Sequence, residues 1–119
     1  MARKRLPECA FLIPIRRDRN LSDGQLHRRT CWKWLEDNLD QFGGATRDTA
    51  LHQGWYPDTD TGKKVVDDSR RYVVALPQDQ VDELRAVLRE ACTVFQQKCI
   101  YLSVAGYVEF VYGPGHETE

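Results

Sequence analysis

An α+β fold is predicted by two strand-like segments with buried patterns, two helix-like segments with amphipathic patterns, and the order in which they alternate. Tyr72–Leu76 has apolar side chains on both faces of a strand, and Cys9–Arg16 has the same character. A strand that is apolar on both faces needs cover on both sides. Both segments are therefore expected in the middle of a sheet.

The two helices are expected at residues 22–42 and from Asp79 to Phe95. Ser22-Asp23-Gly24-Gln25 fits a capping box at the start of the first, and Gly43-Gly44 fits its end because glycine adopts the left-handed conformation easily. Asp79 is a suitable N-cap for the second helix, whose apolar residues recur at helical spacing.

The remaining strands follow from composition and parity. An edge strand is expected at Leu51–Tyr56, a turn at Pro57–Gly62 and a return strand at Lys63–Leu76, which together form a hairpin. Cys99–Tyr112 keeps one apolar parity throughout. We interpret it as one long strand that is bent or bulged at Gly106.

A hairpin at Ala105-Gly106 is the alternative for that last segment. It would place Leu102 opposite Glu109 and so lose the match between apolar positions. The order strand, helix, strand, strand, helix, strand then predicts a ferredoxin-like βαββαβ sandwich with strand order 4-1-3-2 and both helices on one face of the sheet.

The other face of the predicted sheet is apolar and has no cover within the chain. A bare apolar face of this size is unusual in a monomer, so we predict a homodimer joined through the open face or through the last strand. The residues assigned to this face by parity are Leu12, Val73, Ala75, Tyr101 and Tyr107.

Composition indicates one domain over residues 1–119, with flexible ends at 1–8 and 113–119. Hydrophobic residues make up 41% and charged residues 29%, as in globular proteins, and the net charge of −1 argues against a nucleic-acid or anionic-membrane partner. Neither a signal peptide nor a membrane-spanning run is recognised. The four cysteines lack C-x-x-C spacing, which favours reduced thiols and a cytoplasmic location.

From the first helix onward, the chain resembles a family of small uncharacterised bacterial proteins, some of them carried on mobile gene cassettes. The resemblance rests on Phe42-Gly43-Gly44, Gly54-Trp55, Asp68-Ser69-Arg70, Phe95-Gln96-Gln97 and Ile100-Tyr101-Leu102-Ser103-Val104-Ala105-Gly106. It covers about two thirds of the chain. It supports the fold and implies no catalytic residue.

Two patterns suggest ion binding but have simpler explanations. Asp58-x-Asp60-x-Gly62 resembles the start of a calcium loop, yet Ser69 stands where the twelfth-position carboxylate is needed, so an acidic turn is favoured. The histidines are scattered and lack neighbouring cysteines or carboxylates at ligand spacing. No metal site and no cofactor is therefore predicted.

The most suggestive side chains lie on the predicted hairpin. The charges of residues 67–71 could bind an anion or position a proton-transfer group, or could simply keep the hairpin from aggregating. Trp55 and its neighbour Tyr56 could line a small-molecule pocket or a protein interface. The candidate ligand-binding residues are His52, Trp55, Asp68, Arg70 and Tyr72.

Two functional hypotheses follow. The first is a non-enzymatic dimeric module that binds a small ligand or a protein, since no nucleophile–base pair, metal cluster or phosphate loop is recognised. The second is a cofactor-independent dimeric α/β-barrel enzyme that acts on a small organic molecule through the same candidate residues. RNA-recognition domains share the topology, but Phe11 and Arg71-Tyr72 match their aromatic signature only weakly.

Overall fold

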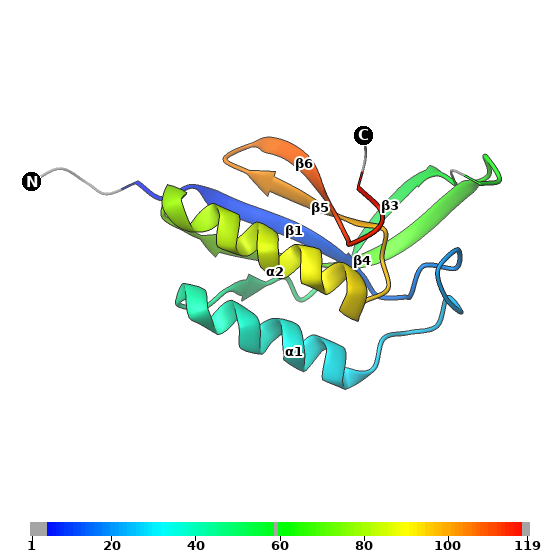
Figure 1. Ribbon diagram of the computed structural model, residues 1–119, viewed down its shortest axis with the longest axis horizontal. Helices are drawn as coiled ribbons and strands as arrows, with labels where there is room; N and C mark the ends of the chain where they lie inside the picture. Colours follow the sequence, from blue (N-terminus) through cyan, green and yellow to red (C-terminus); the bar gives the residue numbers. More distant parts are fainter. Residues whose placement is uncertain (1–4, 59, 118–119) are drawn as a thin grey trace, which may run out of the picture.

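The computed structural model describes residues 5–58 and 60–117. It is an α+β structure in which one six-stranded antiparallel sheet carries both helices on one face (Figure 1). The strands are β1 (Glu8–Pro14), β2 (Thr46–Arg47), β3 (His52–Pro57), β4 (Lys64–Ala75), β5 (Cys99–Val104) and β6 (Tyr107–Tyr112). The helical segments are α1 (Arg29–Leu39), η1 (Asp40–Phe42), η2 (Gln78–Gln80) and α2 (Val81–Val94).

The strand order is β2-β4-β1-β5-β6, with β3 paired to the first half of β4. The prediction that the first and third expected strands are central is confirmed, because β1 pairs with both β4 and β5, and β4 pairs with β1 on one side and with β2 and β3 on the other. The order nevertheless differs from the predicted 4-1-3-2. The short strand β2 adds to the edge of β4, and the last predicted strand is divided into two.

The core lies between the helices and one face of the sheet. Phe11 of β1 stacks on Tyr72 of β4 with ring centroids 5.4 Å apart, and both side chains are almost fully buried. Leu35 and Leu88 from the two helices are fully buried against the same face. Tyr72 therefore lies under the helices.

The first helix begins seven residues later than predicted. Gly24 has a φ of +69°, which a helix cannot contain, and the Asp23 carboxylate accepts a hydrogen bond from the Gln25 backbone N–H at 3.0 Å. Aspartate competes in this way with helix formation, so the predicted capping box does not form. The predicted stop is confirmed, because Gly43 has a φ of +85°.

The prediction of Asp79 as the N-cap of the second helix is wrong, because Asp79 lies in the turn η2 and the N-cap is Gln80, with no side-chain hydrogen bond to the helix. The expected turn after Tyr56 is present: the Asp58 carboxylate accepts hydrogen bonds from the backbone N–H groups of Asp60 and Thr61 at 2.7 and 3.2 Å. Residue 59 of this turn and the predicted flexible residues 1–4 and 118–119 lie outside the described residues.

The prediction of one long last strand is wrong. Ala105 and Gly106 have φ values of 50° and 88°, and this two-residue turn makes β5 and β6 a hairpin. Leu102 does lie opposite Glu109. The mismatch is tolerated because Glu109 extends to Arg85 of α2, with Nε–Oε1 and Nη2–Oε2 distances of 2.6 and 3.1 Å.

The open face of the sheet, on the side away from the helices, differs from the prediction by one residue. Leu12, Val73, Ala75 and Tyr101 alternate with buried core residues and therefore lie on the open face, as predicted. Tyr107 pairs with Val104, so the hairpin turns it toward the helix side.

Candidate functional site

The open face is arranged in rows that run across the strands. One row is Arg71, Leu12, Tyr101 and Phe110, taken from β4, β1, β5 and β6 in turn. Neighbouring strands are about 4.8 Å apart, so this row spans about 14 Å. Tyr101 and Phe110 meet edge to face with ring centroids 6.0 Å apart, and Phe110 is 54% exposed. The row therefore places an aromatic pair at one end and a guanidinium at the other.

A histidine held by a carboxylate stands at the Arg71 end of this row. The Asp48 Oδ2 atom lies 2.7 Å from His52 Nε2 and 3.5 Å from Arg71 Nη1. Asp48 is positioned by its backbone N–H, which donates to the Arg71 carbonyl at 3.0 Å. An imidazole oriented by a carboxylate can transfer a proton through its other nitrogen.

The same face continues along the hairpin of β3 and β4, which extends beyond the rest of the sheet (Figure 1). The Tyr56 hydroxyl donates to Asp67 Oδ2 at 2.8 Å. Partial burial raises the Tyr56 pKa well above its usual value, and the hydrogen bond to Asp67 adds to the effect. Tyr56 is therefore a neutral hydrogen-bonding group at physiological pH.

Together these side chains form what we call the open-face strip: Asp48, His52, Tyr56, Asp67 and Arg71. Asp67 and Arg71 are four residues apart in β4, so their Cα atoms are separated by about 13 Å. Gly54 lies between His52 and Tyr56 in β3, and a Cβ atom built there meets no atom within 4 Å. The strip thus offers two carboxylates, an imidazole and a guanidinium over the length of a small molecule.

The predicted ligand-binding residues are not gathered in one place. Of the five, His52 belongs to the open-face strip. Trp55 and Asp68 project from the opposite face of the hairpin, where Trp55 is 67% exposed with Lys64 Nζ 5.4 Å from its ring centroid. The Gln53 side-chain amide donates to Asp68 Oδ1 at 3.4 Å.

The other two predicted residues support the core. The Arg70 guanidinium lies over the Trp32 ring of α1 at 4.0 Å from the ring centroid. Tyr72 is 1% exposed, and its hydroxyl donates to Glu36 Oε2 at 2.9 Å. Whether any of the five contacts a ligand stays a prediction.

Asp48 is the member of the strip that the sequence reasoning missed. It lies between the end of the first predicted helix and the predicted edge strand at Leu51–Tyr56, where no helix or strand was expected. The short strand β2, Thr46–Arg47, pairs with β4 and brings this loop beside Arg71. The only available signal was the spacing of Asp48 and His52, four residues apart, which is weak outside a helix.

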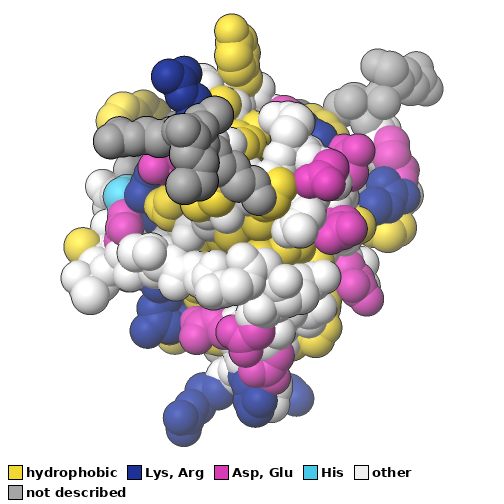
Figure 2. Space-filling model, turned by 90° about the vertical axis from the view of Figure 1, so that its left-hand side faces the viewer, with side chains coloured by type: hydrophobic (Ala, Val, Ile, Leu, Met, Phe, Trp, Pro, Cys, Tyr) yellow, Lys and Arg dark blue, Asp and Glu magenta, His cyan; other side chains and the backbone are white. Residues whose placement is uncertain are grey.

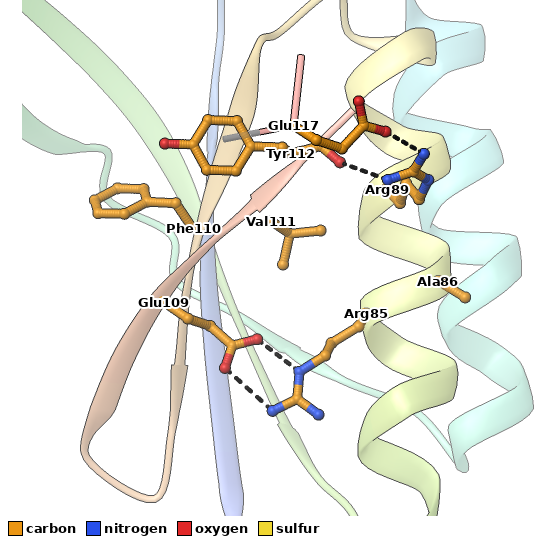
Figure 3. A pocket seen from close by; sticks show the side chains of 8 residues that line it. All are labelled: Arg85, Ala86, Arg89, Glu109, Phe110, Val111, Tyr112 and Glu117. Atoms are coloured by element: carbon orange, nitrogen blue, oxygen red, sulfur yellow. Dashed lines mark hydrogen bonds and ion pairs between the residues drawn. The ribbon is translucent and has the colours of Figure 1, made fainter. Parts of the chain in front are cut away.

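Apart from the open face, the structure has a groove between α2 and β6 (Figure 3). It has a volume of about 370 Å³ and is lined by Arg85, Ala86, Arg89, Glu109, Phe110, Val111, Tyr112 and Glu117. Glu109 and Val111 point toward the helix, whereas Phe110 and Tyr112 point toward the other side of the strand. This groove is open and contains two arginine–glutamate pairs.

Hydrophobic side chains are also gathered at the end of the molecule that carries the β5–β6 turn. Figure 2 shows them in the middle of this end, with acidic and basic side chains around them. Tyr107, Val108 and Phe110 of β6 are all more than half exposed. Next to the β5–β6 turn, the outer edge of the sheet therefore exposes apolar side chains on both sides, Tyr107 on one and Val108 and Phe110 on the other.

Nucleophilic chemistry is disfavoured at three of the cysteines, Cys9, Cys92 and Cys99. All four cysteines are free thiols. Burial raises the pKa of Cys92 to about 12 and also raises the pKa values of Cys9 and Cys99. Thiols with raised pKa values are poor nucleophiles at neutral pH.

Within residues 5–58 and 60–117, no group of three or more histidine, cysteine, aspartate or glutamate side chains could hold a metal ion. No helix in the same residues is long and apolar enough to cross a membrane.

Among solved structures, two of phage S-adenosylmethionine (SAM) lyase share this fold. One, in complex with S-methyl-5'-thioadenosine, aligns with a TM-score of 0.66 at 15% identity and covers 98% of each chain. The other, in the apo state, aligns with a TM-score of 0.64 at 15% identity, over 98% of this chain and 100% of that one. At this identity the likeness shows the fold alone.

No protein-family model matches the chain, and no curated protein matches it. The resemblance to small bacterial proteins therefore stays a prediction.

Proposed function

We propose that this protein is a small enzyme that binds SAM, or a related adenosyl sulfonium, on the open face of its sheet. The observation that carries the proposal is the alignment with a SAM lyase over nearly the full length of both chains. This favours the second of the two sequence-based hypotheses, an enzyme acting on a small organic molecule.

The row from Phe110 to Arg71 fits the chemistry of such a ligand. The adenine ring can stack on an aromatic side chain, here Tyr101 or Phe110. An amino-acid carboxylate can pair with the Arg71 guanidinium, while Asp48 can accept from the amino group. A sulfonium cation is attracted by carboxylates and by aromatic faces, both of which border this row.

Cleavage of a sulfonium makes modest demands on the protein. When the bond between sulfur and the four-carbon chain breaks, the electron pair goes to sulfur, which leaves as a neutral thioether. The four-carbon fragment becomes neutral at that carbon either by losing a neighbouring proton to a base or by closing a ring with its own carboxylate. In the first route His52, oriented by Asp48, is the base that the strip offers.

A second copy of the chain is part of the proposal. The open face does not enclose a ligand, because its side chains Val108 and Phe110 are themselves more than half exposed. Both signs of charge occur on the strip beside exposed apolar side chains, so this face can be complementary to itself in two copies related by a twofold axis. This second copy would cover the face and enclose the ligand.

The test is to incubate the purified protein with SAM and to follow S-methyl-5'-thioadenosine by liquid chromatography and mass spectrometry. Binding of the thioadenosine is measured separately by calorimetry. We expect product formation, and a loss of about 10- to 100-fold in kcat/KM for Arg71→Gln and for Asp48→Asn, as for a charge-assisted hydrogen bond of about 1.5–3 kcal/mol. Lys33→Gln, at an exposed position on α1, is the matched control and should leave the activity unchanged.

The non-catalytic module is the competing function, and the exposed apolar edge at β6 favours it. Binding of the thioadenosine without turnover of SAM would support that module. If neither SAM nor the thioadenosine binds at millimolar concentration, the proposed function is wrong.

A further inference from the structure

The groove between α2 and β6 holds two arginines whose partners differ in kind (Figure 3). Arg85 is held by Glu109 through two hydrogen bonds, of 2.6 and 3.1 Å, and by Asp82 through a third of 2.7 Å. These partners belong to β6 and to the same helix as Arg85. The hydrogen bonds of Arg85 therefore join α2 to β6 and stabilise the fold.

Arg89 depends on the segment that follows the last strand. Its guanidinium donates to the Glu117 carboxylate and to the Tyr112 carbonyl, the latter at 3.4 Å. Both side chains of the Arg89–Glu117 pair are nearly half exposed. Exposed ion pairs contribute little to stability, so a competing anion can displace Glu117 without disturbing the fold.

The tail places this carboxylate by local contacts. Gly113 packs closely on Cys92 of α2, where a Cβ atom would lie 2.6 Å from the Cβ atom of Cys92. Two residues further on, the Gly115 N–H donates to Glu117 Oε2 at 3.0 Å, which directs the other carboxylate oxygen to Arg89. Glu117 is thus a ligand of Arg89 within the same chain. The tail that carries it is anchored to α2 at Gly113, and Glu117 itself is held by its hydrogen bonds to Gly115 and Arg89.

Space for a larger ligand remains beside this pair. The groove has a volume of about 370 Å³, and its walls include the apolar side chains Ala86 and Val111. A carboxylate or phosphate at Arg89 can therefore extend an apolar part along these two side chains. Glu117 is itself one of the lining residues, so this volume lies beside the Arg89–Glu117 pair.

We propose that the Arg89 end of the groove binds a small organic oxyanion, and that Glu117 is a built-in competitor for this site. The ligand carries a carboxylate or phosphate head and a short apolar part. The site is separate from the open-face strip, and its existence does not depend on the proposed function.

The experiment follows the Nε–Hε resonance of Arg89 in ¹⁵N-labelled full-length protein. Phosphate, acetate and butyrate are titrated in turn at constant ionic strength, with chloride as the reference salt. We expect saturable shifts with tighter binding of butyrate than of acetate. Glu117→Gln should tighten binding roughly two- to fivefold, the factor that an exposed ion pair provides, and Arg89→Gln should abolish it.

Asp37→Asn is the control, because it removes an exposed carboxylate that pairs with Lys33 on α1. It should leave every dissociation constant unchanged. The proposal is overturned if chloride causes equal shifts, or if Glu117→Gln leaves the dissociation constant unchanged. It is also overturned if neither the unmodified protein nor Glu117→Gln shows a saturable shift. A preference for phosphate over both carboxylates would support it and identify a phosphate ligand.

Discussion

At the scale of single residues, His27 is the most unusual group in the structure. Its Nε2 atom lies 2.8 Å from the Pro14 carbonyl oxygen, and its buried Nδ1 atom has no hydrogen-bond partner among the described residues. The ring packs edge to face on both Trp32 and Phe95, with centroid distances of 5.6 and 4.9 Å. Nε2 is therefore the protonated nitrogen of a neutral imidazole, which fastens the loop after β1 to the core.

Burial lowers the pKa of His27, and the positive charges of Arg17 and Arg70 lower it further. Because its folded pKa lies below the ordinary value of about 6.5, the unfolded chain binds more protons at acidic pH. The stability that a neutral His27 provides is complete above pH 6.5 and is lost as pH falls from 6.5 toward the folded pKa. Urea unfolding at pH 7.5 and pH 5 should therefore show a loss of stability on acidification.

His27→Gln should flatten this pH dependence, whereas His52→Gln, on the exposed strip, should leave it in place. The comparison uses the difference between the two pH values within each protein, so a general loss of stability in His27→Gln does not affect it. An equal pH dependence in the His27→Gln protein would show that other groups cause it.

Gly113 provides a second test at this scale. Gly113→Ala would bring a Cβ atom to 2.6 Å from Cys92 Cβ, and we expect a loss of about 1–3 kcal/mol in the free energy of unfolding. Gly54→Ala is the control, since a Cβ atom there meets nothing within 4 Å. Its effect should stay within about 0.5 kcal/mol. Equal losses in the two variants would contradict the close packing at Gly113.

Among the secondary-structure elements, the β5–β6 hairpin shows that a contact from a helix can determine whether a segment forms one strand or two. Parity favoured a single strand because a hairpin puts Glu109 opposite Leu102, on the side of the core. Arg85 of α2 supplies the partner that makes this position acceptable for a carboxylate. Arg85 is separated from Glu109 by 24 residues. Strand periodicity alone gives no indication of such a contact.

The Arg85–Glu109 pair should be coupled by about 0.5–1 kcal/mol in a double-mutant cycle of Arg85→Gln and Glu109→Gln, measured by urea unfolding. Its two parallel hydrogen bonds and its exposed fractions of 36% and 38% place it toward the top of that range. Lys33–Asp37, with fractions of 75% and 58%, is the control pair and should be coupled by about 0.3–0.5 kcal/mol. A coupling below that of the control would show that the pair does not hold the hairpin.

At the scale of the whole molecule, the two faces of the sheet have very different surroundings. One is covered by α1 and α2, and the other carries the open-face strip beside partly exposed apolar side chains. The proposed second copy would cover this face. Light scattering at micromolar concentration should then give twice the mass of one chain.

Val108→Lys would place a charge on the open face and should reduce that mass to one chain. Tyr107→Lys is the matched control, because the neighbouring side chain points to the helix side and should leave the dimer intact. A single-chain mass for the unmodified protein would contradict the proposed dimer. Dissociation by Tyr107→Lys alone would place the contact on the other side of β6.

The central strands, the apolar face of α2 and the burial of Tyr72 follow from the amino-acid pattern, because alternation and helical spacing are local properties that depend on which residues avoid water. The hairpin after Val104 and the contacts among Asp48, His52 and Arg71 became evident only from the packing of the whole chain. Both features depend on contacts between segments far apart in the chain. In the hairpin, Arg85 of α2 allows the Glu109 carboxylate to lie on the helix side of β6, which strand periodicity does not predict.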